Sequence, residues 1–331
     1  MKKLRIALSV LLILAVLAPV FAAGSQEAGA AKPVTLKLGH IQSDQDVWHK
    51  AAVFFAQKVE EKTGGTVKVE VYPNSTIGND RDMAEGLQLG SVDFALIAGV
   101  LGNFEPSLQI LELPYLIENE QHLRNVVYGP IGEELFARLL KSSNIRGLTY
   151  WERGPRHITS NFPINSIADV KGFKMRLPEI PAMLAYWRAA GANPTPMAWG
   201  EVYSALQQKV IDGQENPVPY IHSARLEEVQ SYIAMTAHKY EYVTISMSNK
   251  TYEKLTADQQ KAVYAAAAES AEYQNKLVAE LTETLFKDLQ AKGMKVTNPD
   301  RAPFIAVAQQ VNTDFANKID AELYKKIVAA K

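Results

Sequence analysis

The chain is organised around the stretch Arg156-His-Ile-Thr-Ser-Asn161 and the segment Gly172-Phe-Lys-Met-Arg-Leu-Pro178 that follows it. In the second segment, apolar residues alternate with Lys174 and Arg176, which predicts a β-strand. Pro178 ends this strand because proline cannot donate to the next hydrogen bond of a ladder. Each segment therefore carries an arginine at the edge of a short apolar strand.

A guanidinium beside apolar residues at a strand end can bind a carboxylate through two parallel hydrogen bonds. Arg156 and Arg176 both satisfy this description. An arginine in such a place can equally lie at the surface or hold two domains together. The residue pattern alone leaves both interpretations open.

The same stretch resembles the substrate-binding subunits of tripartite ATP-independent periplasmic (TRAP) transporters, the dicarboxylate-binding-protein-like family. The resemblance extends over nearly all of the chain after its first residues and rests on four segments: Arg156 with Thr159-Ser-Asn161, Asp169-Val-Lys-Gly-Phe-Lys-Met-Arg-Leu-Pro178, Pro194-Thr-Pro-Met-Ala-Trp-Gly-Glu-Val-Tyr203 and Asp212-Gly-Gln-Glu-Asn-Pro217. It implies an α/β, two-lobed, periplasmic-binding-protein-like fold. Each lobe is then a mostly parallel sheet flanked by helices.

The resemblance also implies which residues hold a ligand. Arg176 matches the family's arginine that forms a paired salt bridge to the substrate carboxylate, and Arg156 matches the second, supporting arginine. Asn216 matches the amide that hydrogen-bonds the same carboxylate. Trp199 stands where the family places an aromatic residue that lines the cleft, with packing in the core as the alternative.

The remaining candidates are polar or aromatic residues expected near the pocket: Glu152, Asp80, Arg81, His40, His238 and Tyr220. The loops of Glu152 and Asp80 are those that the family uses for the rest of the ligand, where a carboxylate would accept hydrogen bonds from hydroxyl groups. For the two histidines, a structural role is the alternative.

One difference from the sialic-acid-binding members of the family bears on the nature of the ligand. Sialic-acid-binding members carry a glutamate in the loop after the strand at Asp93, where this chain has Ala98 or Gly99. We therefore expect a hydroxylated six-carbon acid, a uronate or an aldonate. A C4-dicarboxylate or another monocarboxylate is the alternative.

The first residues predict export. Met1-Lys-Lys-Leu-Arg5 is basic, an apolar run too short to span a membrane follows, and Val20-Phe-Ala22 supplies a cleavage site, so residues 1–23 are expected to be a signal peptide. Residues 24–32 are small and polar, which indicates a flexible linker. Removing Lys2, Lys3 and Arg5 leaves 32 basic and 36 acidic side chains, a net charge of −4. This balance favours neither nucleic acid nor an anionic membrane as a partner.

Alternating residue patterns predict the first elements. Strands are expected at 34–38 and 67–71 with a helix between them, which is a βαβ unit and indicates a parallel sheet. A helix at 80–89 and a buried strand at 93–97 follow. The loop after this strand is where an open α/β sheet binds a ligand.

Later elements complete the two lobes. A short strand is expected at Ile211, interrupted by Asp212-Gly213, and Tyr240–Ser248 is expected to return the chain to the first lobe. A helix begins at a capping box at Thr256 and, by family precedent, spans both lobes. The rest is expected as one or two helices that close the second lobe. We expect lobe I to comprise 33–153 and 242–281, and lobe II 154–241 and 282–331.

No motif of a nucleophilic hydrolase, a nucleotide-binding protein or a zinc protease is present, and the chain has no cysteine. Asp44-Gln-Asp46 lacks the ligands that complete a calcium loop. We therefore expect neither a cofactor nor a metal, and no enzyme. The alternatives are a secreted hydrolase or lyase that uses Glu152 or His238 as a base, and the ligand subunit of a sensor.

The resemblance implies a periplasmic receptor whose partners are the small and large membrane subunits of a TRAP permease. We expect the receptor to be a monomer.

Overall fold

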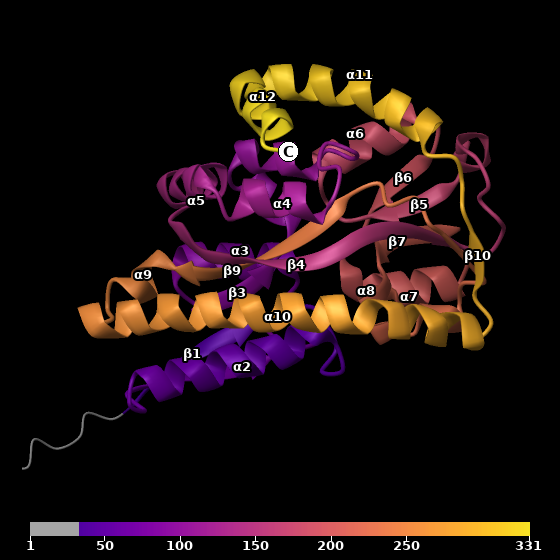
Figure 1. The fold of residues 1–331 in the computed structure, drawn as a ribbon. Helices are drawn as coiled ribbons and strands as arrows, with labels where there is room; N and C mark the ends of the chain where they lie inside the picture. Colours follow the sequence, from indigo (N-terminus) through magenta and orange to yellow (C-terminus); the bar gives the residue numbers. More distant parts are fainter. Residues whose placement is uncertain (1–32) are drawn as a thin grey trace, which may run out of the picture. The chain divides into compact units, whose positions relative to one another are not determined.

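The computed structural model describes residues 33–331, which form one compact unit (Figure 1). The expected signal peptide and linker lie outside the described residues. The strands are β1 (Val34–Gly39), β2 (Val67–Tyr72), β3 (Phe94–Ile97), β4 (Ile145–Ser160), β5 (Lys174–Leu177), β6 (Asn193–Pro196), β7 (Gly213–Pro217), β8 (Tyr232–Ala234), β9 (Tyr240–Ser248) and β10 (Lys295–Thr297). The α-helices are α2 (Val47–Lys62), α3 (Asp80–Leu89), α4 (Glu120–Val127), α5 (Pro130–Ser143), α6 (Pro181–Ala189), α7 (Trp199–Gln207), α8 (Val218–Ser223), α9 (Asn249–Tyr252), α10 (Ala257–Ala291), α11 (Ala302–Ile319) and α12 (Ala321–Ala329).

Parallel strands form the outer parts of the sheet, whose order is β2-β1-β3-β9-β4-β7-β5-β6. β1 pairs in parallel with β2 and β3, and β5 pairs in parallel with β6 and β7. The βαβ unit expected from the sequence is thereby confirmed. The two-lobed α/β architecture follows from these two parallel regions, each with helices beside it.

Two long strands join the parallel regions. β4, with 16 residues, pairs antiparallel with β9 through its first part and with β7 and β8 through its second part. The ladder between β4 and β9 is irregular between Glu152 and Gly154, and Gly154 has a φ of 80°. The sequence indicated only the end of β4, because a strand buried on both faces lacks the alternation that marks a half-buried one.

The predicted long helix is present as α10. Its 35 residues give it a length of about 52 Å. The capping box is confirmed, because Thr256 N donates to Gln259 Oε1 at 2.9 Å and Gln259 N donates to Thr256 Oγ1 at 3.3 Å. α10 runs past β4 from α2 to α8 (Figure 1).

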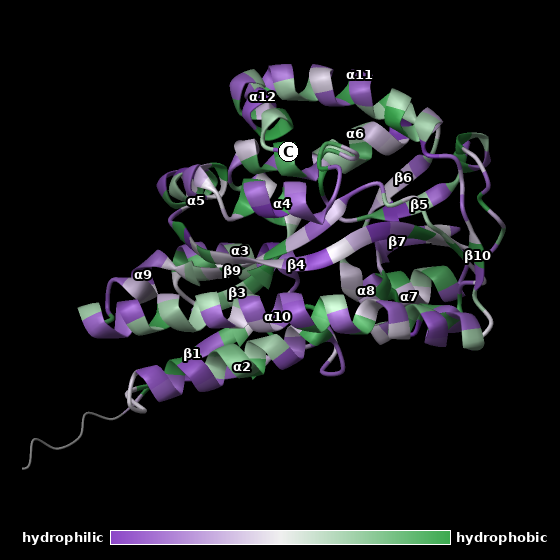
Figure 2. Ribbon diagram, viewed as in Figure 1, coloured by the Kyte–Doolittle hydropathy of each residue, from purple (hydrophilic) through white to green (hydrophobic). Residues whose placement is uncertain are grey.

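α10 supplies apolar side chains to two separate hydrophobic clusters. Val263 and Ala267 belong to the larger cluster, which contains both parallel regions of the sheet. Leu289 belongs to the smaller cluster with Leu206 and Ile221. Polar and apolar positions therefore alternate along the helix (Figure 2), as expected when one face packs and the other meets solvent.

The last residues form two helices. α11 packs against α6 and against the 3-10 helix Pro106–Glu112, and α12 packs against α5. The C-terminal helices therefore also contact residues that the sequence analysis assigned to the first lobe.

The start of one expected strand is wrong: Ile211 and Asp212 form a bend, and β7 begins at Gly213, which was expected to interrupt the strand. Gly213 belongs to β7 because the strand packs closely on its neighbours. A Cβ atom on Gly213 would lie 2.0 Å from the Thr159 carbonyl oxygen and 2.6 Å from the Phe173 ring. The glycine therefore lets β7 approach β4 and carry Glu215 and Asn216 to their positions.

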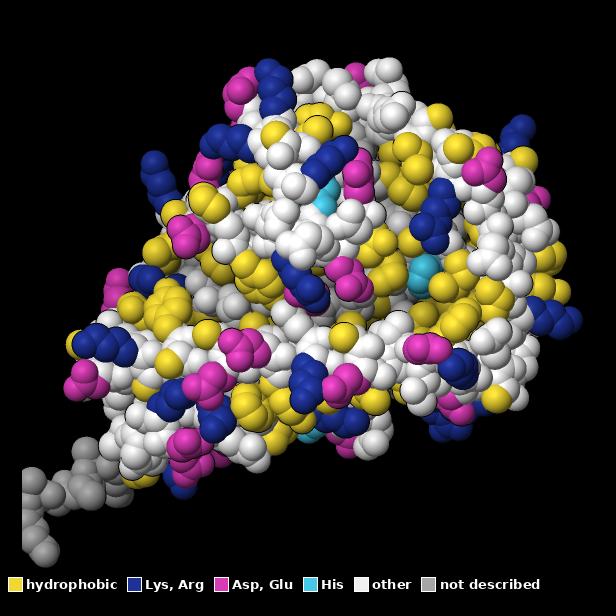
Figure 3. Space-filling view, viewed as in Figure 1, with side chains coloured by type: hydrophobic (Ala, Val, Ile, Leu, Met, Phe, Trp, Pro, Cys, Tyr) yellow, Lys and Arg dark blue, Asp and Glu magenta, His cyan; other side chains and the backbone are white. Residues whose placement is uncertain are grey.

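The surface is of mixed charge. Acidic and basic side chains are interspersed on the face that carries α10 (Figure 3). Within residues 33–331, no helix has both the length and the apolar character needed to cross a membrane.

Replacing Gly213 by Ala should lower the free energy of unfolding by about 2–3 kcal/mol, because the added methyl group forces β7 away from β4. The matched control is Gly200→Ala in α7, where a Cβ atom meets nothing within 4 Å. That change should be neutral or stabilising by up to about 1 kcal/mol. Urea unfolding measures both values, and equal stability of the two variants would contradict the close packing.

Candidate ligand-binding site

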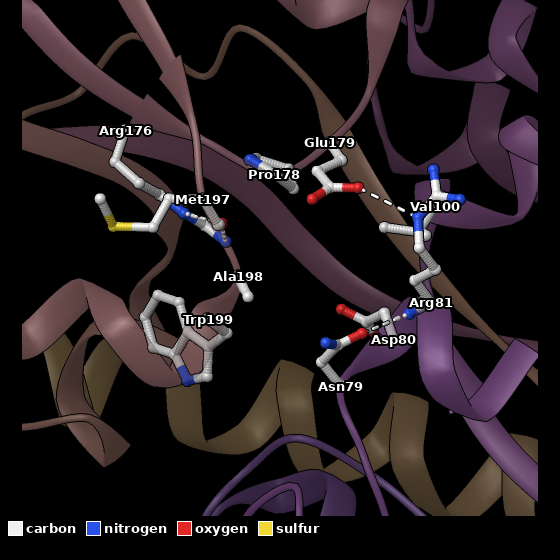
Figure 4. Close-up of a pocket in the computed structure, with 10 residues that line it drawn as sticks. All are labelled: Asn79, Asp80, Arg81, Val100, Arg176, Pro178, Glu179, Met197, Ala198 and Trp199. Carbon is white, nitrogen blue, oxygen red and sulfur yellow. Dashed lines mark hydrogen bonds and ion pairs between the residues drawn. The ribbon is translucent and has the colours of Figure 1, made fainter.

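Two adjoining pockets lie where the loops after β1, β2 and β3 face β5, the β6–α7 segment and α8. One wall carries Asn79, Asp80 and Arg81 at the start of α3, and the opposite wall carries Arg176, Met197 and Trp199 (Figure 4). The deeper pocket is lined by Ile41, Trp48, Asp80, Ala98, Gly99, Val100, Arg153, Arg156, Arg176, Pro178, Ile180, Asn216, Tyr220 and Glu241. The structure thus brings the ends of distant strands together at one cleft.

Arg176 is held with one edge of its guanidinium free. Its Nε and Nη2 atoms both donate to the Met197 carbonyl oxygen, at 2.9 and 2.7 Å. These bonds fix the side chain and leave the edge formed by Nη1 and Nη2 for another acceptor. The Trp199 ring centroid lies 5.4 Å from its Cζ. Burial lowers the pKa of Arg176 to about 10, so it remains a cation at neutral pH, suited to a carboxylate.

Arg156 also lines the deeper pocket, but protein groups occupy most of its donors. Its Nε and Nη2 atoms bind the Glu215 carboxylate, Nη2 donates to the Glu215 carbonyl oxygen at 2.8 Å, and Nη1 binds Glu241. Four of its five N–H groups are therefore engaged within the protein. The supporting arginine expected from the sequence can offer a ligand one donor at most in this conformation.

Asn216, Tyr220 and Trp199 line the cleft as the sequence analysis expected. The Asn216 side-chain amide donates to Gln214 Oε1 at 2.6 Å, which leaves its own carbonyl oxygen and second N–H group. Trp199 is half-buried and packs on Tyr220 with 4.3 Å between the ring centroids. Trp199 therefore combines the two expected roles, packing in the core and lining of the cleft: one part packs against the core and another borders the cleft.

Asp80 and Arg81 differ in their surroundings although they are adjacent. Asp80 Oδ1 is enclosed and has no hydrogen-bond partner among the described residues. Burial raises the Asp80 pKa to about 7, although Arg176 and Arg153 oppose the shift. Arg81 is half-exposed at the rim, where its Nε lies 3.3 Å from Glu179 Oε2 (Figure 4).

Three candidates do not line either pocket. Glu152 accepts two hydrogen bonds from Arg124, at 2.7 and 2.8 Å. His40 is fully buried beside His49, and burial lowers its pKa to about 3. His238 is also fully buried, with Nε2 2.9 Å from Glu215 Oε2. Burial in the protein interior gives these three side chains structural partners instead of access to the cleft.

One functional candidate was missed by the sequence analysis. Arg153 lines the deeper pocket and contacts the rings of both Trp48 and Tyr220. The only signal in the sequence is a third arginine close to Arg156, and nothing there distinguishes it from a surface residue.

The described residues offer no group of three or more histidine or acidic side chains placed to bind a metal ion. The cleft therefore presents cations, one isolated carboxyl group, amides and aromatic rings. This chemistry suits an anion that also carries hydroxyl groups.

Asp80→Asn should change how stability depends on pH. The pKa of Asp80 rises from 3.8 to about 7 on folding, so the folded state holds this proton more tightly, and the wild type loses stability as the pH rises from about 4 to 7. The unfolding free energy of Asp80→Asn relative to that of the wild type should therefore increase over this pH range and stay constant above it. Urea titrations at a series of pH values measure this difference.

Asp44→Asn, which changes an exposed aspartate in the loop before α2, is the control for removal of one charge. A constant difference between wild type and Asp80→Asn from pH 4 to 8 would contradict the enclosed position of the carboxyl group.

Comparison with known proteins places this cleft in context. Residues 38–318 match the bacterial extracellular solute-binding proteins of family 7, the DctP family. A solute-binding protein of Roseobacter denitrificans is 40% identical over 291 residues, which cover 87% of this chain and 89% of the relative.

Solved structures show the same likeness. The structure of a TRAP periplasmic solute-binding protein from Roseobacter denitrificans, with bound L-galactonate, matches 90% of this chain and 99% of its own with a TM-score of 0.86 and 37% identity. Two others, from Bordetella with density interpreted as pantoate and from Polaromonas with D-erythronate, match 90% of this chain and 99% of theirs with TM-scores of 0.87 and identities of 35% and 32%. The fold, the cleft and these matches agree, and the chain belongs to the bacterial extracellular solute-binding proteins of family 7.

Proposed function

We propose that this protein is an extracytoplasmic receptor that binds a sugar acid in the cleft and delivers it to a TRAP membrane permease. The observation that carries the proposal is Arg176, a buried cation fixed by the Met197 carbonyl oxygen with one edge facing the pocket. A carboxylate that leaves water needs charge-assisted hydrogen bonds to both of its oxygens, and a planar fork supplies them in one geometry.

Hydroxyl groups on the ligand are favoured by the other groups in the cleft. Asp80 offers an unpartnered carboxyl oxygen, Asn216 an amide and Tyr220 a hydroxyl group. The solved relatives hold hydroxylated acids, L-galactonate and D-erythronate among them. Ala98 and Gly99 border the pocket, and neither offers the carboxylate that sialic-acid-binding members are expected to use. We therefore propose an aldonate or a uronate in preference to a C4-dicarboxylate.

A role as an enzyme has less support. The two candidate bases lie outside the cleft, where Arg124 binds Glu152 and Glu215 binds His238. The family consists of solute-binding proteins. We infer that the protein binds its ligand without transforming it, as a monomer in the periplasm after export. Service to a sensor in place of a permease remains the alternative within this proposal.

The two walls are proposed to close over the ligand. We place the lobe boundary at residues 153/154, where the β4–β9 ladder is irregular and Gly154 has a positive φ. At the rim, Glu179 meets Arg81 across the cleft and its carbonyl oxygen accepts a hydrogen bond from Asn103 Nδ2 at 2.8 Å. Such exposed contacts are weak individually, so ligand contacts to both walls would decide the balance between open and closed forms.

Arg176→Ala should weaken binding of a sugar acid by about 3–5 kcal/mol, because the ligand carboxylate loses its charged partner in a buried place. Arg176→Lys should fail similarly, since a single ammonium group cannot replace the fork. Isothermal titration with L-galactonate measures both losses. Arg188→Ala, an exposed arginine on α6, is the control, and a lysine variant with wild-type affinity would rule out the two-pronged contact.

Ligand binding should reduce the radius of gyration in small-angle scattering, because a ligand that touches both walls favours the closed form. Arg176→Ala should show no reduction at the same ligand concentration. No change in a saturated wild-type sample would speak against closure.

A further inference from the structure

Arg153 is a buried cation that lies against two neighbouring aromatic rings. Only 5% of its surface is exposed. Its Cζ lies 4.5 Å from the Trp48 ring centroid and 4.8 Å from that of Tyr220. The two ring centroids lie 6.2 Å apart, so the rings contact the guanidinium from adjacent directions and these cation–π contacts orient the side chain.

The guanidinium of Arg153 has donors to spare. Within residues 33–331, no group accepts a hydrogen bond from it, and the carboxylate of Glu241 lies 3.7 Å from Nη1, beyond hydrogen-bonding distance. Glu241 is already bound by Arg156 and Lys239. A buried guanidinium with unused N–H groups carries a large desolvation cost unless another acceptor meets it.

An acceptor can reach Arg153 from the deeper pocket, which it shares with Arg176 and Asp80. Arg153 also lines a smaller pocket with Asp46 and Gln274, whose empty volume is about 190 Å³ against about 380 Å³ for the deeper one, so the deeper pocket has more room for a ligand. Arg153 comes from β4 and Arg176 from β5, with β7 between them in the sheet. Two strand spacings separate their backbones by about 10 Å. The two guanidinium groups therefore reach the pocket from different strands, which suits contacts with different parts of one ligand.

We propose that Arg153 is a specificity-determining residue that donates hydrogen bonds to hydroxyl oxygens at the end of the ligand remote from its carboxylate. The inference rests on the proposed function and adds the ligand class: a polyhydroxy acid with a single carboxylate and a chain long enough to reach from Arg176 to Arg153. Shorter hydroxy acids fill only the part of the pocket at Arg176.

The charges that line the deeper pocket favour one carboxylate over two. They are three cations, Arg153, Arg156 and Arg176, and two carboxyl groups, Asp80 and Glu241. Glu215 pairs with Arg156 from outside the pocket lining, and Asp80, whose pKa is raised to about 7, is neutral when protonated. With Asp80 protonated, the excess is one positive charge, which one ligand carboxylate neutralises. A second carboxylate at Arg153 would leave a buried negative charge without a partner.

The test compares two acids that share a carboxylate and the configuration of the neighbouring hydroxyl groups at C2 and C3 but differ in length: the six-carbon L-galactonate and the four-carbon D-threonate. The test variant is Arg153→Met, which places an apolar chain against Trp48 and Tyr220. Glu241 keeps its bonds to Arg156 and Lys239 in this variant. Arg153→Lys, which keeps the charge but lacks the planar fork, is the second variant. Thermal unfolding shows that each variant is folded.

Wild type should bind L-galactonate more tightly than D-threonate. Arg153→Met should weaken binding of L-galactonate by about tenfold to a hundredfold, the range for a lost hydrogen bond to a charged group, and binding of D-threonate by less than about threefold. If Arg153→Met does not fold, Arg153→Lys should show the same selective loss. Arg176→Ala should weaken binding of both acids.

Equal loss for both acids, no loss for either, or a wild type without preference for the longer acid would each overturn the role of Arg153 while leaving the proposed function intact. A wild type that binds neither acid would instead refute the proposed sugar-acid receptor, and the role of Arg153 with it.

Discussion

The cleft depends on the buried ion pairs that Arg156 makes with Glu215 of β7 and Glu241 of β9. All three side chains are almost completely enclosed, so the loss of any one would leave an uncompensated charge in the protein interior. Burial alone would raise the pKa of Glu215, but Arg156 outweighs it and holds this pKa below its usual value. The three strands are thereby held together at the point where the chain passes from one wall to the other.

The network extends on both sides of Arg156. His238 Nε2 lies 2.9 Å from Glu215, and Lys239 Nζ lies 2.7 Å from Glu241 and 2.9 Å from Glu112. Because Glu215 and Glu241 are already engaged by Arg156, His238 and Lys239, Arg176 and Arg153 are the two cations of the deeper pocket whose hydrogen-bonding capacity is directed elsewhere. A pairing that looks purely structural thus determines which arginines remain free for a ligand.

The sequence predicted the local features of this protein well and the long-range ones poorly. Helix caps, such as Thr256 with Gln259, and the βαβ unit depend on residues close together in the chain. The partners of Glu152 and Arg156 lie 28 and 59 or more residues away, and no periodicity indicates such pairs. Arg153 was missed for the same reason: it contacts Trp48 and Tyr220, which are distant in the sequence and are brought together only by the fold.

The sharing of α10 between two hydrophobic clusters affects how the protein comes apart. Leu289 and Val263 sit on one continuous helix, yet each belongs to a different cluster. Loss of either cluster would expose one end of α10 and weaken the packing that keeps the other end helical, since a long helix depends on tertiary contacts for most of its stability. The two clusters are therefore thermodynamically coupled, and the protein should denature in one cooperative transition.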